Sequence, residues 1–175
     1  MPVNVIPERL NDFRVYADGT TDLLGVANIE LPSFEALTET VSGAGIAGEY
    51  ESPVIGHFGS MKLTLNWRTV TKDSLKLLRQ RAQRLDCRGV FQEYDAASGS
   101  HRFPQVRVVV QGLPTTSSLG SFEKNSASDG STELEILYIK IEIDGKTVVE
   151  LDKLNYKFVV DGTDYLAGIR RGLGL

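Results

Sequence analysis

Apolar and polar residues alternate along three stretches of the chain, and this alternation limits the possible folds more than any other feature of the sequence. The stretches are residues 61–68, 106–111 and 137–143. A period of two places successive side chains on opposite faces of a β-strand. Each strand then buries one face and exposes the other to water. We therefore expect a mainly β fold, a β-sandwich or split barrel.

Turn residues join these stretches into hairpins. Asp144-Gly145 directly follows the third stretch, and Asp-Gly is a strong signal for a two-residue hairpin turn. The returning strand is expected over residues 146–151. A second hairpin is expected near the start of the chain, from a strand at 13–16 through a turn around Asp18-Gly19 to a strand at 23–31.

One amphipathic helix is expected after the first alternating stretch. Thr71 or Asp73 would cap its start, and it would end near Asp86. We expect its apolar face to pack on the sheet face that carries Leu63, Leu65 and Trp67, and a shorter helical turn to form over 164–171. The apolar face, at spacings of three and four, consists of Leu75, Leu78, Ala82 and Leu85.

The chain has 175 residues, which suits a single domain over residues 1–175. Two segments rich in Gly, Ser or Thr, 42–60 and 113–131, indicate long loops, and the first is an extended glycine-rich loop. Loops of this length in a compact domain are usually functional or disordered. No run of about 18 apolar residues occurs, so no membrane-spanning helix is expected.

The sequence offers no convincing catalytic, cofactor or metal site. Residues 43–48 match the dinucleotide-binding pattern G-x-G-x-x-G, but Pro53 and two more glycines follow, so the segment cannot open the helix that this motif needs. His57 and His101 lack the spacing of metal ligands. Cys87 has no identifiable partner base and fits a packing role better than a nucleophile. We therefore expect a protein without enzymatic activity.

Charge argues against a dedicated nucleic-acid binder. The net charge is −4, and the arginines at 79–88 and 170–171 have no aromatic residues interleaved for base stacking. Two other classes remain as alternatives. A β-barrel nucleic-acid or ligand-binding module needs a basic or aromatic groove, and a hydrolase needs a nucleophile with a partner base.

Four stretches, read in order, carry a resemblance that covers nearly the whole chain. They are LNDFRVY, LGVA and LPSF within 10–34, the glycine-rich TETVSGAGIAGE at 38–49, LTLNWR at 63–68, and IDGK, DKLN, DGTDYL and the Gly-Leu terminus within 143–175. The ordered combination resembles the major tail tube proteins of contractile-tailed phages, the FII-type family that R-type bacteriocins and related injection particles share.

The resemblance implies β-sandwich or split-barrel subunits in hexameric rings, stacked into a tube inside a contractile sheath. The implied partners are further copies of the chain, the tail sheath protein, the tape-measure protein and a baseplate or tube-initiator protein, with DNA only as passing cargo and no membrane. The implied location is the virion tail, assembled in the host cytoplasm. A bacteriocin tube or another contractile injection particle stays an alternative.

Contacts between subunits are expected from the glycine-rich hairpin and from the apolar C-terminal tail. We expect the hairpin to be mobile in a free subunit and ordered between subunits, and the tail to pack on its own sheet or on a ring neighbour. The expected contact residues are Gly43, Gly45, Ile46, Gly48, Tyr50, Ile55, Phe58, Ile169, Leu173 and Leu175.

The wall of such a tube should be neutral or negative, because basic walls bind phosphates and release counterions. Two pairs are candidates for this wall, Lys62 with Arg68 and Lys140 with Glu142. The sequence does not decide between them, since a register error of one residue exchanges the two faces of a strand.

Overall fold

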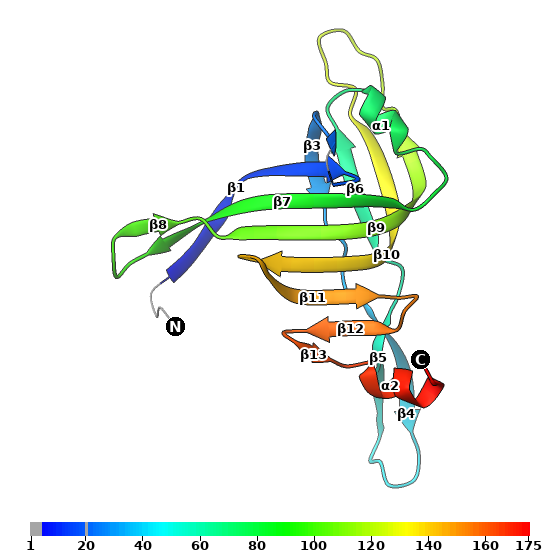
Figure 1. The fold of residues 1–175 in the computed structure, drawn as a ribbon. Helices are drawn as coiled ribbons and strands as arrows, with labels where there is room; N and C mark the ends of the chain where they lie inside the picture. Colours follow the sequence, from blue (N-terminus) through cyan, green and yellow to red (C-terminus); the bar gives the residue numbers. More distant parts are fainter. Residues whose placement is uncertain (1–4, 20) are drawn as a thin grey trace.

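The computed structural model describes residues 5–19 and 21–175, which form a mainly β fold, as the alternation predicts (Figure 1). Within these residues, eleven strands form one large antiparallel sheet and two form a separate hairpin. The helices are α1 (Lys72–Lys76) and α2 (Ala167–Leu173). The strands are β1 (Val5–Ala17), β2 (Thr21–Asp22), β3 (Val26–Glu30), β4 (Ala36–Ser42), β5 (Glu49–Phe58), β6 (Lys62–Trp67), β7 (Gln83–Asp95), β8 (Ser100–Arg102), β9 (Gln105–Ser118), β10 (Gly130–Ile143), β11 (Lys146–Asp152), β12 (Lys157–Val160) and β13 (Thr163–Asp164).

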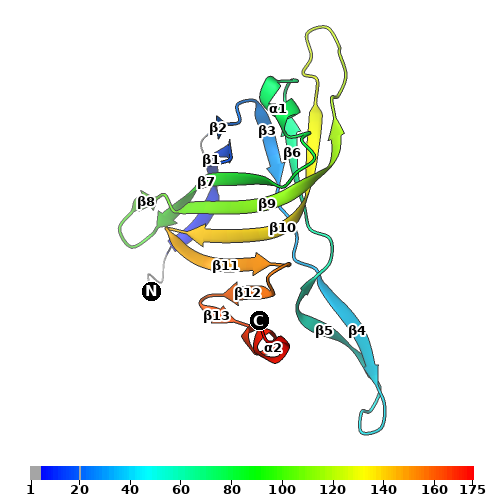
Figure 2. The ribbon, with the colours of Figure 1, turned by 45° about the vertical axis from the view of Figure 1, so that its right-hand side comes forward.

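The large sheet folds over on itself at β9 and β10. Its long layer has the order β13-β12-β11-β10-β9-β7-β1-β2, while β6 pairs with the first half of β10 and β3 pairs with β6 (Figures 1 and 2). β10 contacts β6 over residues 130–135 and β11 over 138–143, and register shifts in the β9–β10 ladder lie near this change of partner. Such shifts increase local bending and twist. The sheet therefore forms a split barrel with its core in the bend.

The core fills the space between the two layers of the bend. In the long layer, Leu85 of β7 lies opposite Val110 of β9, which lies opposite Ile139 of β10, and all three are buried. The indole of Trp67 donates a hydrogen bond to the buried hydroxyl of Thr132 at 3.1 Å, so this polar pair is satisfied. The alternation around β6 is confirmed by four buried residues, Met61, Leu63, Leu65 and Trp67.

The prediction of a long helix that ends near Asp86 is wrong, because only the beginning of this helix forms. Thr71 caps α1 as predicted, accepting a hydrogen bond from the Ser74 backbone at 3.1 Å, but the helix ends at Lys76. A strand, β7, begins at Gln83, and Leu85 is buried on that strand. The residues after Gln83 also alternate, and pairing of β7 with both β1 and β9 stabilises the extended form, so tertiary pairing decides between the two periodicities.

The apolar contact of α1 is made by a different leucine from the ones expected. Leu77 is 1% exposed, whereas Leu75 and Leu78 are 42% and 41% exposed. We expect Leu77→Asp to destabilise the subunit by about 3 kcal/mol or more, because it buries an unpaired charge. Leu78→Asp is the matched control and should cost much less. Thermal unfolding of the two variants measures the difference, and equal melting temperatures would contradict this account of α1.

Both segments expected to be long loops contain strands, and the first is mostly strand. Residues 42–60 contain β5, which pairs with β4 in a hairpin, and only the tip at 43–48 is a turn. Residues 113–131 contain the ends of β9 and β10, whose ladder continues to Ser118 and Ser131, so only the 119–129 loop is irregular. Hydrogen bonds between the paired backbones stabilise these strands, although the two segments contain few apolar side chains.

The two ends of the chain differ in how well they match expectation. β1 turns at Asp18 and Gly19, both with positive φ, but its partner there is the two-residue β2. The expected returning strand is instead β3, which pairs with β6 and not with β1. The Asp144-Gly145 hairpin and the C-terminal helix are confirmed. No helix among the described residues is long and apolar enough to cross a membrane.

Candidate assembly surfaces

One face of the long layer packs on the core, and the opposite face is almost entirely polar. The register aligns side chains of this second face in rows across the strands: Tyr16, Asp86, Val109, Lys140 and Glu150 form one row. We call this surface the paired face. Its members are Arg14, Tyr16, Arg84, Asp86, Arg88, Arg107, Val109, Gln111, Tyr138, Lys140, Glu142, Glu150, Asp152, Lys157, Val159 and Asp164.

A chain of ion pairs crosses the centre of the paired face. Asp86 is 1% exposed and accepts hydrogen bonds from Arg107 at 2.7 Å and from Arg88 at 2.8 Å. Arg107 also donates to Glu142 at 3.2 Å, and Lys140 contacts the other oxygen of Glu142 at 2.7 Å. Burial alone would raise the pKa of Asp86, but the hydrogen bonds from Arg107 and then Arg88 outweigh it and lower the pKa to about 2.

Several other charges of this face are paired as well. Glu150 accepts a hydrogen bond from the Tyr138 hydroxyl at 3.1 Å and contacts Lys157 at 2.8 Å. Arg170 of α2 pairs with Asp164, and its hydrogen bond lowers the pKa of that carboxyl. Ion pairs within one subunit therefore neutralise most of the charges on this face. Among the described residues, none of the large apolar side chains that are exposed elsewhere belongs to the paired face.

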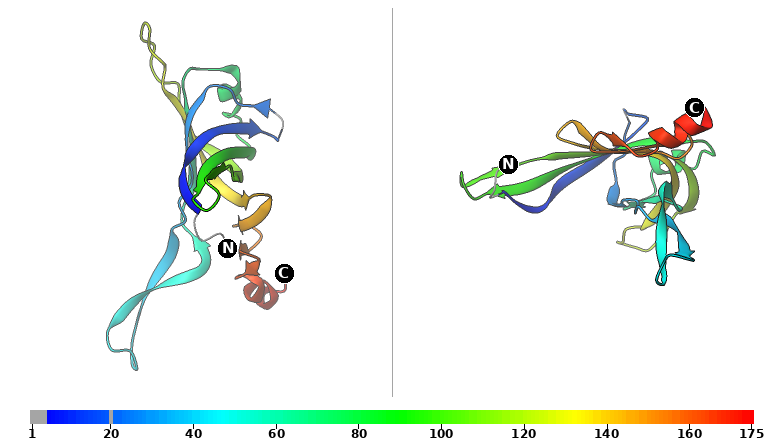
Figure 3. Two further views of the ribbon diagram at one scale, coloured as in Figure 1. Left: turned by 90° about the vertical axis from the view of Figure 1, so that its left-hand side faces the viewer. Right: turned by 90° about the horizontal axis from the view of Figure 1, so that it is seen from below.

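Ten of the exposed large apolar side chains lie at the two ends of the subunit, which are far apart (Figures 1 and 3). One end is the β4–β5 hairpin, and the other carries α1 and the 119–129 loop. A monomeric soluble protein rarely leaves so many uncovered. The exposed apolar residues of the hairpin are Leu37, Ile46, Tyr50, Val54 and Ile55; those of the opposite end are Leu24, Leu75, Leu78, Leu119 and Phe122.

In the described part of the chain, the outer edge of the long layer at β1 also lacks a partner strand over most of its length. β1 pairs with β2 only at Tyr16 and Ala17, so most of its outer edge has no strand partner among the described residues. An apolar groove of about 200 Å³ opens between β1, β7 and β3, lined by residues such as Leu10, Leu31 and Phe91. A free edge next to an apolar groove is a template for pairing with another chain.

Residues 7–174 match the family of phage tail tube protein FII. The chain belongs to this family. The match covers almost the whole chain, so the resemblance drawn from the sequence is confirmed. The major tail tube protein of Serratia phage KSP20 is 23% identical over 171 residues, which are 97% of this chain and 98% of that protein.

A solved structure has a similar fold. It is the sheath/tube terminator of the PVC extracellular contractile injection system in its extended state, with a TM-score of 0.52 and 13% identity, covering 75% of this chain and 94% of that one. At this identity the similarity concerns the fold alone. The family match makes this chain a structural subunit of a tail tube, and its mainly β fold is similar to that of the solved structure.

The tail tube subunit places its ten expected contact residues in two neighbouring regions. Gly43, Gly45, Ile46 and Gly48 form the hairpin tip, and Tyr50 and Ile55 are exposed along β5. Phe58 is different, because it packs inside the subunit, its ring 5.0 Å from that of Phe158. Three exposed residues lie on or after α2: Ile169, Leu173 and Leu175. Their contacts with other subunits stay a prediction.

The two regions meet through Leu166, which is buried against Gly56 at the base of the hairpin. A Cβ atom at Gly56 would lie 2.5 Å from the Leu166 side chain, so this close approach requires glycine. Sequence reasoning missed this contact, and it also missed Phe122 and the pairing of charges on the paired face.

The residues with potentially reactive side chains, Cys87, His57 and His101, lie in separate parts of the fold. Cys87 is buried in the core, where burial raises the pKa of its thiol to about 12, so it is not a nucleophile at neutral pH. His57 lies 3.0 Å from the carbonyl of Ile55, and His101 lies near Glu8 and Tyr94. The glycine-rich motif at 43–48 is followed by β5 and not by a helix, so it does not have the dinucleotide-binding context.

Proposed function

We propose that the subunit assembles into hexameric rings that stack into the inner tube of a contractile tail, with the paired face lining the channel. The observation that carries the proposal is the contrast between surfaces: the paired face is polar and self-neutralised, while both ends and the β1 edge expose apolar groups. Surfaces that bind protein need apolar contact, and a channel wall needs none. In this arrangement Lys140 and Glu142 face the channel.

Ring closure follows from the open sheet. Joining the β1 edge of one subunit to the β13 side of the next covers the unpaired backbone groups, and a head-to-tail contact that closes on itself gives a ring. The sixfold number is the one that the family resemblance implies. Rings then stack through the apolar ends, and the protein has a structural role without catalysis.

The proposed partners follow from this position. The tail sheath protein would surround the outer wall, a baseplate or tube-initiator protein would hold the first ring, and the tape-measure protein or DNA would occupy the channel. Assembly would take place in the host cytoplasm. A bacteriocin or other injection particle would use the same subunit geometry with a different cargo.

Electron microscopy of the purified chain tests the proposal. We expect rings with sixfold end views and, at higher protein concentration, tubes of uniform width. Reconstruction of the tubes should place Lys140 and Glu142 on the channel wall. A protein that stays monomeric across concentration and salt, or a tube with the paired face outside, would contradict it.

The hairpin tip gives a separate test of stacking. Replacing residues 43–48 by Asn-Gly keeps a tight turn. Positions such as Gly43 and Gly45 have no other residue within 4 Å of where a Cβ would lie, so we expect the melting temperature to change by no more than about 2 °C. Tubes should be lost while rings remain. Full-length tubes from this variant, seen by microscopy, would show that the tip is dispensable.

A further inference from the structure

Phe122 is the most exposed large hydrophobic side chain in the described part of the subunit, at 96% of its full accessible area. It lies on the 119–129 loop, at the end of the subunit opposite the hairpin (Figures 1 and 3). Burying an aromatic ring is strongly favourable, so a fully exposed one marks a contact surface.

Backbone hydrogen bonds close the loop directly before Phe122. The Ser121 backbone donates to the carbonyl of Ser128 at 2.8 Å, and the Ser128 backbone donates to the carbonyl of Arg68 at 3.0 Å. Gly120 has a φ of 75°, and a Cβ there would lie 1.6 Å from the Ser128 carbonyl oxygen, so only glycine fits. Closure of the loop base reduces the backbone conformational entropy that this segment has to lose when it binds.

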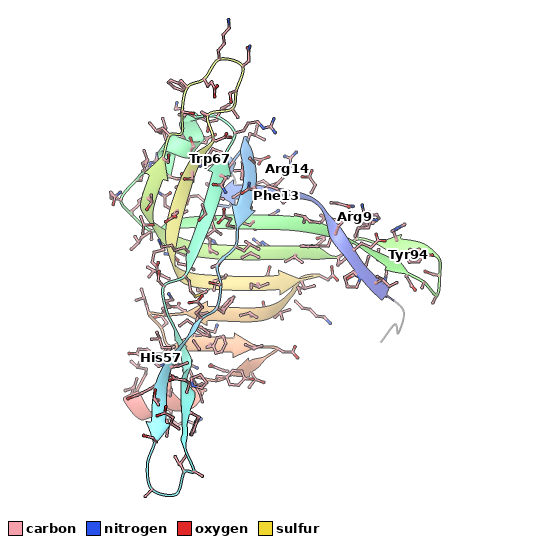
Figure 4. All side chains as sticks on the ribbon, turned by 180° about the vertical axis from the view of Figure 1, so that it is seen from behind. Arg9, Phe13, Arg14, His57, Trp67 and Tyr94 are labelled. Carbon is pink, nitrogen blue, oxygen red and sulfur yellow. The ribbon has the colours of Figure 1, made fainter. Side chains whose placement is uncertain are left out.

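A pocket of about 160 Å³ lies at the opposite end, where the hairpin leaves the body of the subunit. Its apolar lining includes Leu37, Phe58, Tyr156 and Leu166, and the labelled His57 marks its position (Figure 4). We call it the foot pocket. An apolar cavity of about 150 Å³ is large enough to hold benzene, so the foot pocket has room for one aromatic ring.

The foot pocket also has aromatic and charged groups that suit this loop. Phe58 stands edge-on to both Phe34 and Phe158, with ring centroids 5.6 and 5.0 Å apart, so a further aromatic ring would extend an existing cluster. Asp152 and Lys153 are also part of the pocket. Lys153 already contacts Glu135 at 3.5 Å and donates to the carbonyl of Gly59 at 2.8 Å, but Lys124 of the loop, two residues after Phe122, would find an opposite charge in Asp152.

We infer that Phe122 of each subunit inserts into the foot pocket of a subunit in the neighbouring ring. Stacked rings are related head to tail, so one end of every subunit faces the opposite end of another. Phe122 lies at one of those two ends, and the foot pocket, whose lining is part apolar and part polar, lies toward the other. This inference rests on the proposed function, because it needs stacked rings, and it assigns the contact that joins them.

Cysteine cross-linking tests the contact directly while leaving Phe122 in place. A chain with both Glu123→Cys and Leu37→Cys is assembled into tubes and oxidised. Every disulfide then joins two rings, so a non-reducing gel should show a ladder of dimers, trimers and longer products. The matched control combines Glu123→Cys with Ser98→Cys, which lies in the β7–β8 turn away from both ends, and should give no ladder.

Substitution of Phe122 supplies a second measurement. Phe122→Ser should keep its melting temperature and its rings, but the protein concentration needed for tubes should rise about tenfold or more. Lys124→Ser on the same loop should change that concentration less than about threefold. Tubes from the unchanged chain combined with an absent ladder, or with a normal Phe122→Ser variant, overturn this inference and leave the proposed function intact. Absence of tubes from the unchanged chain overturns both.

Discussion

Asp86→Asn should convert tubes that do not retain DNA into tubes that bind it. The aspartate is the shared acceptor for Arg88 and Arg107, and its neutralisation removes the carboxylate that pairs with Arg88 and leaves Arg107 with Glu142 alone. Both arginine side chains are partly exposed on the proposed channel wall, at 49% and 39%, so they can turn toward a phosphate. In a ring, each subunit contributes the same change.

The expected effect is large because counterion release accumulates over phosphates. A protein that contacts 6–10 phosphates loses roughly 10³–10⁵ in affinity between 50 and 200 mM salt. We expect Asp86→Asn tubes, assembled with a short DNA duplex and pelleted, to retain DNA at low salt and release it over this range. Tubes of the unchanged chain should retain none.

Asp18→Asn is the matched control for this experiment. It changes the net charge by the same amount, but Asp18 lies in an exposed turn with positive φ, outside the paired face, where Asn is well tolerated. DNA retention by both variants would mean that net charge alone controls binding. Retention by neither would mean that the paired arginines do not face the channel.

The pairing around Asp86 should persist at every pH relevant to the particle. Its folded-state pKa of about 2 lies below the ordinary value of 3.8. The pairing therefore stabilises the folded subunit fully above that ordinary value, and this contribution is lost as the pH falls through the folded-state pKa. Lowering the pH moderately from neutral therefore leaves Asp86 ionised and does not release the two arginines.

The strands could be predicted from the sequence because their period is local. Met61 to Trp67 alternate with polar residues whichever strand lies beside them, and the structure buries the apolar set. The helix was misjudged because Leu85 fits both a helical and an extended pattern. Its pairing opposite Val110 decides for the strand, and that partner lies 25 positions away. Long-range pairing of this kind is not encoded in a short window.

The assembly surfaces were predictable only where composition marks them. Glycines identify the hairpin tip, and apolar residues near Leu175 identify the exposed C-terminus. The paired face was not predictable, because Asp86, Arg107 and Glu142 come together only through the register of three strands. Phe122 was missed for another reason. An apolar residue is expected to be buried, and its exposure depends on the loop closed at Gly120.

Truncation at two positions should separate folding from assembly in the C-terminal region. Leu166 is 2% exposed against Gly56, and the ring of Phe158 lies between those of Phe58 and Tyr165. Ending the chain after Gly162 removes β13, Tyr165 and Leu166, and it uncovers this cluster. We expect a loss of about 3–5 kcal/mol in stability and aggregated protein, because a well-packed apolar contact is replaced by water-exposed surface.

Ending the chain after Leu166 should give the opposite result. The buried leucine stays, and the main losses inside the subunit are the bonds of the partly exposed Arg170 to Asp164 and to the Tyr156 carbonyl, which solvent weakens. The exposed Ile169, Leu173 and Leu175 are also gone. This variant should therefore be folded and soluble but unable to form rings, as seen by size-exclusion chromatography and electron microscopy. If it forms normal rings, these three residues serve no ring contact; if it aggregates like the shorter chain, α2 belongs to the folding core of the subunit and not to its assembly surface.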